Sequence, residues 1–204
     1  MLNASSEITK MHSVGLRAER KIGLLLVTLL LFFLPAKSQD ICMTSNGTVS
    51  FFSETPVENI DATSNQAIGA INVKTKAVFF KVKMTTFEFK KALMQEHFNE
   101  NYVESHDYPY STFNGTINEP VDLTKDGTYN VTATGKLTVH GVEKSRTIPG
   151  TVTVKGGTID LTSDFDVTVA DHSIKIPTVV VKNIAEVVKV NVKATMAPSR
   201  TETK

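Results

Sequence analysis

Tryptophan is absent from this chain of 204 residues, and cysteine occurs once, at Cys42. A single cysteine excludes an internal disulfide and a zinc site built from several cysteines. The residues before it, Gln39, Asp40 and Ile41, are not the small and aliphatic residues that precede a lipid-modified cysteine, so we expect no lipid anchor there. A domain without disulfides depends on its own hydrophobic core, and this chain is long enough to bury one.

An excess of positive charge is also missing. After residue 38 the chain holds 17 Lys and Arg against 19 Asp and Glu, a formal charge of −2. No basic stripe remains that would follow a phosphate backbone, so we expect no nucleic-acid partner.

The sequence lacks the motifs of common catalytic sites. No Gly-x-Ser-x-Gly elbow presents a serine beside His140 or His172, and the zinc motif His-Glu-x-x-His is absent. One stretch is rich in possible metal ligands, but their spacing matches no strong motif. These residues are Glu96, His97, Glu100, Glu104, His106 and Asp107. We predict no catalytic residue, no metal and no cofactor, and the alternative is a metal-assisted hydrolase around His97 and Glu100.

The N-terminus has the pattern of a secretion signal. Basic residues precede an uninterrupted apolar run of 13 residues, 22–34, which is followed by Pro35-Ala36-Lys37-Ser38. This order matches a charged region, a hydrophobic region and a small-residue cleavage site. An uncleaved anchor would need about 20 apolar residues. We predict a signal peptide at 1–38, a single domain at 39–204, a periplasmic or extracellular location, and no permanent membrane insertion.

Apolar and polar residues alternate with a period of two through most of residues 39–204, most regularly from Ile159 to Val169. This alternation predicts half-buried β-strands. The predicted strands are 49–53, 68–73, 78–84, 113–117, 129–139, 148–154, 159–169 and 188–194. Short turns rich in Gly and Asn separate many of them and favour antiparallel neighbours. The predicted turns are 45–47, 72–76, 125–127, 140–141 and 155–157.

One segment has helical spacing instead. Apolar residues recur every three or four positions between Phe87 and Tyr102, which predicts an amphipathic helix over 88–101. Many short strands and one helix are typical of a sandwich or a closed barrel, and closure removes exposed sheet edges. The outward positions are Lys, Asp, Asn and Thr, without the aromatic girdles of a transmembrane barrel. We therefore predict an all-β, antiparallel eight-stranded barrel with its apolar side inward.

Four stretches point to a known family. They are GTVSFFS at 47–53, LMQEHFNENYVES at 93–105 continuing to 115, GKLTVHGVEK at 135–144, and FDVTVADH at 165–172 with IKIP at 174–177. Together they resemble the YceI-like lipid- and polyisoprenoid-binding family, in the short extracytoplasmic form common in Bacteroidetes. The resemblance covers about residues 45–196. The His-Leu-Gly stretch of better characterised members is missing, and residues 93–105 stand in its place.

The resemblance implies a lipocalin-like barrel that binds a long apolar molecule, in some members a polyisoprenoid or isoprenoid quinone, without a cofactor or catalytic residues. A lipid site requires a dry cavity lined by apolar side chains. The candidate ligand-binding residues are Phe51, Phe80, Val82, Phe87, Phe89, Leu93, Met94, Phe98, Phe113, Ile117, Leu137, Val139, Ile159, Leu161, Phe165 and Val167. Small inward residues would leave room for a ligand, namely Ala133, Gly135, Gly150 and Ser163.

Two questions stay open at this level. The apolar face of the helix either gates the barrel or plugs it permanently, and the interior either holds a ligand or is filled by side chains. We predict a monomeric or homodimeric binding protein whose partner is a long-chain apolar small molecule. The alternative is a non-enzymatic envelope or stress protein with a filled barrel that binds a protein partner.

Overall fold

The computed structural model describes residues 40–54, 59–176 and 185–199. The predicted signal peptide lies outside these residues and stays a prediction. The strands are β1 (Ile41–Ser53), β2 (Ile60–Asn72), β3 (Ala77–Lys83), β4 (Glu88–Phe89), β5 (Tyr110–Ile117), β6 (Gly127–Val139), β7 (Val142–Lys155), β8 (Thr158–Thr168) and β9 (Val187–Pro198). In the described part of the chain, no helix is both long and apolar enough to span a membrane.

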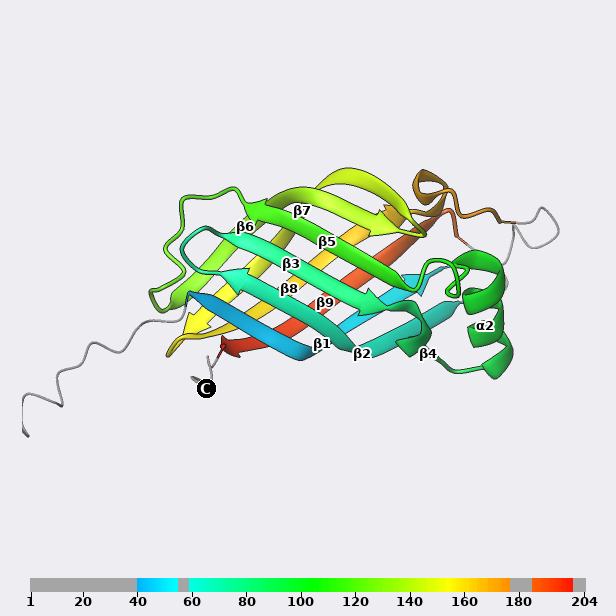
Figure 1. Ribbon diagram of the computed structural model, residues 1–204, viewed down its shortest axis with the longest axis horizontal. Helices are drawn as coiled ribbons and strands as arrows, with labels where there is room; N and C mark the ends of the chain where they lie inside the picture. The colour runs from blue at the N-terminus through cyan, green and yellow to red at the C-terminus, as the bar shows by residue number, and fades with distance from the viewer. Residues whose placement is uncertain (1–39, 55–58, 177–184, 200–204) are drawn as a thin grey trace, which may run out of the picture. The chain divides into compact units, whose positions relative to one another are not determined.

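The strands close into an antiparallel barrel (Figure 1). Their order is β1-β9-β8-β7-β6-β5-β3-β2, and β2 pairs again with β1. Strand β4 is only two residues long and adds to β2 at the edge. The prediction of an eight-stranded antiparallel barrel is confirmed, and the sandwich is excluded because both edges of the sheet are paired.

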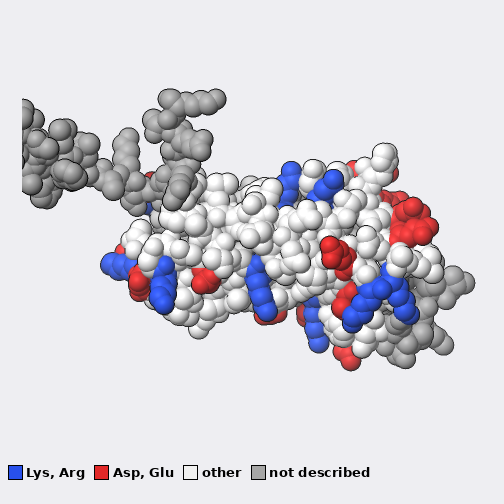
Figure 2. All heavy atoms as spheres, turned by 90° about the horizontal axis from the view of Figure 1, so that it is seen from below, with Lys and Arg blue, Asp and Glu red and all other residues white. Residues whose placement is uncertain are grey.

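The outer face of the barrel is polar, as the alternation predicts. Neighbouring strands β8 and β9 are joined there by side-chain hydrogen bonds, from Asn191 Nδ2 to Asp164 Oδ1 at 2.7 Å and from Thr195 Oγ1 to Asp160 Oδ1 at 2.5 Å. Figure 2 shows acidic and basic side chains interspersed on one face rather than gathered into a basic stripe. Polar side chains therefore occupy the outer face of the sheet, and the alternating apolar side chains occupy the inner face.

Strands β1 and β2 are longer than predicted. The predicted turn at 45–47 is a β-bulge inside β1, where the register shifts on both sides of Gly47. Strand β2 begins at Ile60, which pairs with Ser53 of β1, and its first half buries small residues, among them Ala62 and Ser64. The Ser64 hydroxyl is satisfied by a hydrogen bond with Thr86 Oγ1 at 2.6 Å. Small buried residues of this kind leave no trace in a pattern of large apolar side chains.

The predicted helix at 88–101 begins later than expected. The structure has a helix α2 (Ala92–His97) that continues as the π-helical turn η3 (Phe98–Tyr102). Residues 88 and 89 instead form β4, in which Phe89 pairs with Ala62. The tertiary pairing with β2 therefore overrides the helical spacing at this end. A 3₁₀ turn, η2 (Met84–Thr86), lies between β3 and β4.

The barrel end beside the β5–β6 loop is closed by side chains. Leu123, in that loop, is only 1% exposed and belongs to the core cluster at this end. The buried members of this cluster are Cys42, Ile71, Val78, Ile117, Leu123, Val131, Val152, Val154, Ile159, Ala194 and Met196. In Figure 1 the loop lies at the end of the barrel opposite α2.

Asp122 stabilises the turn that holds Leu123. Its carboxylate accepts hydrogen bonds from Thr124 Oγ1 at 2.6 Å and from the Thr124 amide at 3.1 Å, and it pairs with Lys125 Nζ at 3.1 Å. The Thr124 hydroxyl, followed by Lys125, lowers the pKa of Asp122 from 3.8 to about 2. A depressed carboxyl pKa contributes stability that is present above pH 3.8 and is lost as the pH falls through about 2.

We therefore expect Asp122→Asn to lower the thermal midpoint slightly at neutral pH, and this difference from the wild type to disappear as the pH falls from about 4 to about 2. Circular dichroism melts of both proteins across this range measure it. The exposed Asp166 is the control position, where Asn is expected to leave the midpoint unchanged. A difference for Asp122→Asn that persists at the lowest pH would contradict the assignment.

Candidate functional site

The barrel interior contains a cavity of about 580 Å³. Sites for small molecules typically measure about 300–1,000 Å³. Among the described residues, those that line the cavity are mostly apolar and include no Asp or Glu. The barrel is therefore not filled along its whole length.

Fifteen of the sixteen candidate residues line this cavity, which places them where a ligand would contact them. Ligand contact itself stays a prediction. Ile159 is the exception, because it is 0% exposed and packs in the closed-end cluster beside Met196. It has the inward parity that the sequence predicts, but it lies too close to the closed end to reach the cavity.

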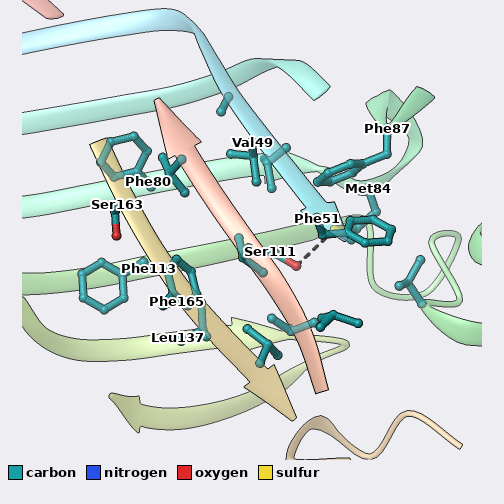
Figure 3. A pocket seen from close by; sticks show the side chains of 18 of the residues that line it. Val49, Phe51, Phe80, Met84, Phe87, Ser111, Phe113, Leu137, Ser163 and Phe165 are labelled. Carbon is teal, nitrogen blue, oxygen red and sulfur yellow. Dashed lines mark hydrogen bonds between the residues drawn. The ribbon is translucent and has the colours of Figure 1, made fainter. Parts of the chain in front are cut away.

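Aromatic side chains from neighbouring strands form one wall (Figure 3). Phe80 of β3 pairs with Phe113 of β5, which pairs in turn with Leu137 of β6. On the other side Phe80 pairs with Gly69, where an added Cβ would lie 2.7 Å from the Phe80 ring. Gly69 thus makes room for the ring.

Of the small residues expected to leave room, three line the cavity and one does not. Ala133, Gly150 and Ser163 are part of the wall. Gly135 instead permits a close approach of β5 and β6, because a Cβ there would lie 2.3 Å from the backbone oxygen of Asn114. Its role is in strand packing rather than in the size of the cavity.

Four phenylalanines meet at the α2 end of the barrel. The rings of Phe51, Phe87, Phe89 and Phe98 contact one another with centroids 5.0–5.8 Å apart. Helical spacing alone does not explain this cluster, since Phe87 and Phe89 lie before α2 while Phe51 comes from β1. The cluster packs α2 and η3 onto the barrel while its rings also line the cavity.

The cavity reaches the surface beside α2. Leu93 lines the cavity and yet is 59% exposed. Polar residues of the same segment, Lys91, His97 and Tyr102, also belong to the lining. Burial raises the pKa of the Tyr102 hydroxyl above its ordinary value of 10.0, so this group, already neutral near pH 7, stays neutral to still higher pH. We call this end the mouth and define it by Lys91, Leu93, His97 and Tyr102.

Several lining residues were not predicted from the sequence. They are Val49, Ser53, Ile60, Ala67, Val78, Lys81, Met84, Lys91, His97, Tyr102, Val103, Ser111, Thr112, Val131, Ile148, Pro149, Val152, Val169, Ile174, Ile176, Val188, Val190 and Val192. Some were detectable, because the valines of β9 alternate with Lys189, Asn191 and Lys193 and so share the inward parity. Ile174 and Ile176 lie outside the predicted strands, so strand parity did not identify them.

Three serines of the wall are hydrogen-bonded within the protein. Ser111 Oγ donates to Met84 Sδ at 3.1 Å (Figure 3), and Ser163 Oγ donates to the Pro149 carbonyl at 2.6 Å. Ser53 Oγ accepts from the Ala185 amide at 3.0 Å. Wall groups that are satisfied in this way suit an apolar occupant, since they do not require water.

His140 and His172, the two histidines considered above for a serine hydrolase, hold neighbouring segments of the chain together. His140 Nδ1 lies 3.1 Å from the His172 carbonyl oxygen, and its Nε2 lies 2.6 Å from Glu104 Oε2. His172 Nδ1 in turn lies 3.0 Å from the Val142 carbonyl. These contacts join the segment after η3 to the β6–β7 hairpin and to the 3₁₀ turn η4 (Val169–His172).

Over residues 40–54, 59–176 and 185–199, no group of three or more metal-ligating side chains is arranged to hold a metal.

Comparison with known proteins gives one family and several similar folds. The family model of the YceI-like domain matches residues 42–196. A polyisoprenoid binding domain from Saccharophagus degradans is 13% identical, with a TM-score of 0.67, over 79% of this chain and 99% of its own. BcnA of Burkholderia cenocepacia is 18% identical, with a TM-score of 0.62, over 74% and 96% respectively. The YCEI protein of Campylobacter jejuni is 13% identical, with a TM-score of 0.58, over 72% and 90%. No protein of curated function matches the sequence.

Proposed function

The chain belongs to the YceI-like domain family, and from this membership we propose that it is a binding protein that holds a long-chain apolar molecule inside its barrel. The single observation that supports the proposal most strongly is the apolar cavity with a mouth at one end. The similar fold of a polyisoprenoid binding domain adds support. We take the ligand to be a polyisoprenoid, an isoprenoid quinone or another lipid.

Burial of the ligand chain supplies most of the affinity in this proposal. Each methylene that leaves water for an apolar site contributes about 0.8 kcal/mol. The wall offers few polar partners, because its serines are already hydrogen-bonded. The polar end of the ligand then lies at the mouth, near His97 and Tyr102.

We propose further that the protein acts outside the cytoplasm, in the periplasm. The support is the N-terminal sequence, with basic residues ahead of the apolar run 22–34 and a small-residue site at Ser38. A carrier of apolar molecules in an aqueous compartment needs an interior that shields its cargo from water, and the cavity provides one. The mass of the mature chain, measured in the experiment below, tests the cleavage site.

Native mass spectrometry of protein purified from a bacterial envelope tests the proposal. We expect a complex of one chain with one lipid, a chain that begins at Gln39, and a long-chain apolar compound in the organic extract. The denaturing spectrum of the same sample is the control, because unfolding releases the ligand and shows the chain alone. Protein that remains empty even after gentle extraction would contradict the carrier function and favour a barrel that binds a protein partner.

A further inference from the structure

The cavity is closed at one end and has a limited volume, so it limits the length of its occupant. A water molecule in the liquid occupies about 30 Å³, and a methylene group is of similar size. The volume of about 580 Å³ then corresponds to about 20 such groups. Resting on the proposed function, we propose that the barrel selects an apolar chain of about 20 carbon atoms and that its closed end sets this length.

The limit on chain length arises at the floor of the cavity, the layer of side chains at its closed end. Ile117, Val131 and Val152 line the cavity and also belong to the closed-end cluster that contains Leu123. Below them Leu123, Ile159 and Met196 are each at most 1% exposed. A chain that reaches this layer has no further space in this direction.

The mouth fixes the other end of the chain. The lining has no carboxylate among the described residues, and the polar side chains of the mouth include the neutral hydroxyl of Tyr102 and the imidazole of His97. A head group that accepts hydrogen bonds is therefore placed at the mouth, and the chain runs from there toward Val131. A chain longer than the limit keeps its surplus carbon atoms, together with the head group, outside the mouth in water.

This arrangement predicts how affinity depends on chain length. Each added methylene tightens binding by up to about fourfold while it is still buried. Carbon atoms beyond the floor limit add nothing, because they stay exposed to solvent. Affinity is expected to rise steeply with length and then to level off.

A series of isoprenoid alcohols tests the limit: geraniol, farnesol, geranylgeraniol, geranylfarnesol and solanesol, each delivered from the same cyclodextrin carrier. Their dissociation constants are measured by displacement of cis-parinaric acid from the full mature protein. We expect affinity to increase by at least about a hundredfold from geraniol to geranylgeraniol and to stay level beyond it.

Two substitutions move the floor in opposite directions. Leu123→Ala deepens the cavity, so affinity is expected to continue rising to geranylfarnesol. Val131→Phe raises the floor, so affinity is expected to level off at farnesol, and this variant remains informative if Leu123→Ala does not fold. Ile68→Ala is the control, because this exposed residue of β2 lies outside the cavity lining and its truncation leaves the plateau at geranylgeraniol.

The outcomes separate the two proposals. If no alcohol displaces the probe, the proposed function fails. If affinity continues to rise through solanesol in the wild type, or if the floor variants leave the plateau unmoved, the length limit is overturned while the carrier function stands.

Discussion

A charge on the inner face of β8, introduced by Phe165→Asp, is expected to weaken ligand binding by a hundredfold or more. Phe165 lines the cavity, where the carboxylate would face mostly apolar side chains, and the ammonium of Lys81 is held over the Tyr110 ring. An unpaired charge in such surroundings costs several kcal/mol, and about 1.4 kcal/mol corresponds to a tenfold loss of affinity. Displacement of a fluorescent fatty acid from the purified variant measures the effect.

Thr162→Asp is the matched control for this prediction. It introduces the same residue into the same strand, at an exposed position on the outer face. We expect it to bind as the wild type does. Circular dichroism has to show that both variants are folded, and equal affinities of the two would exclude the barrel interior as the binding site.

Ile159→Ala is expected to reduce the free energy of unfolding by about 2–5 kcal/mol, as is typical when a large apolar side chain is removed from a packed core. Its affinity for farnesol, which is shorter than the length limit and does not reach the floor, should stay close to that of the wild type, because Ile159 lies outside the cavity lining. Urea unfolding and ligand displacement on the same sample measure both quantities.

Leu161→Ala, two residues further along β8, is the comparison. Leu161 lines the cavity and is only partly buried, so we expect a smaller loss of stability and a clear loss of affinity. A cavity-lining residue and a core residue thus give opposite patterns within one strand. If both variants lost affinity equally, the boundary between cavity and closed end would be wrong.

The strands were predictable because alternation is local. Each strand from β5 to β9 shows its inward face in its own residues, as in Leu137 and Val139 or in Phe165 and Val167. The prediction failed where the buried residues are small, at Ala62 and Ser64, since hydrophobic periodicity does not detect them. Pairing with β1, a long-range interaction, shows that β2 begins at Ile60 rather than at residue 68 as predicted.

The helix was predicted with the wrong beginning for a related reason. Phe87 and Phe89 are two residues apart, which fits an extended chain as well as the edge of a helix. Only the pairing of Phe89 with Ala62 decides between the two. The sequence therefore indicates an apolar cluster at Phe87 and Phe89 but does not show whether the backbone there is a strand or a helix.

The inner face of the site was predictable, but its depth and its volume were not. Parity shows that Ile159 and Phe165 both point inward, while their positions along the barrel axis depend on strand register and tilt. The same two quantities determine the radius of the barrel and so decide between a cavity and a filled interior. Neither can be deduced from a single strand.

The pairing of β1 with β9 has a consequence for biosynthesis. Strand β9 supplies Val188, Val190 and Val192 to the cavity wall and joins the first strand, for example through Phe51 and Val190. The ribosome makes this strand after the other eight described strands, so the barrel cannot close before β9 has been translated. Contacts between segments so distant in the chain also slow folding. The cavity therefore forms only after translation has passed β9.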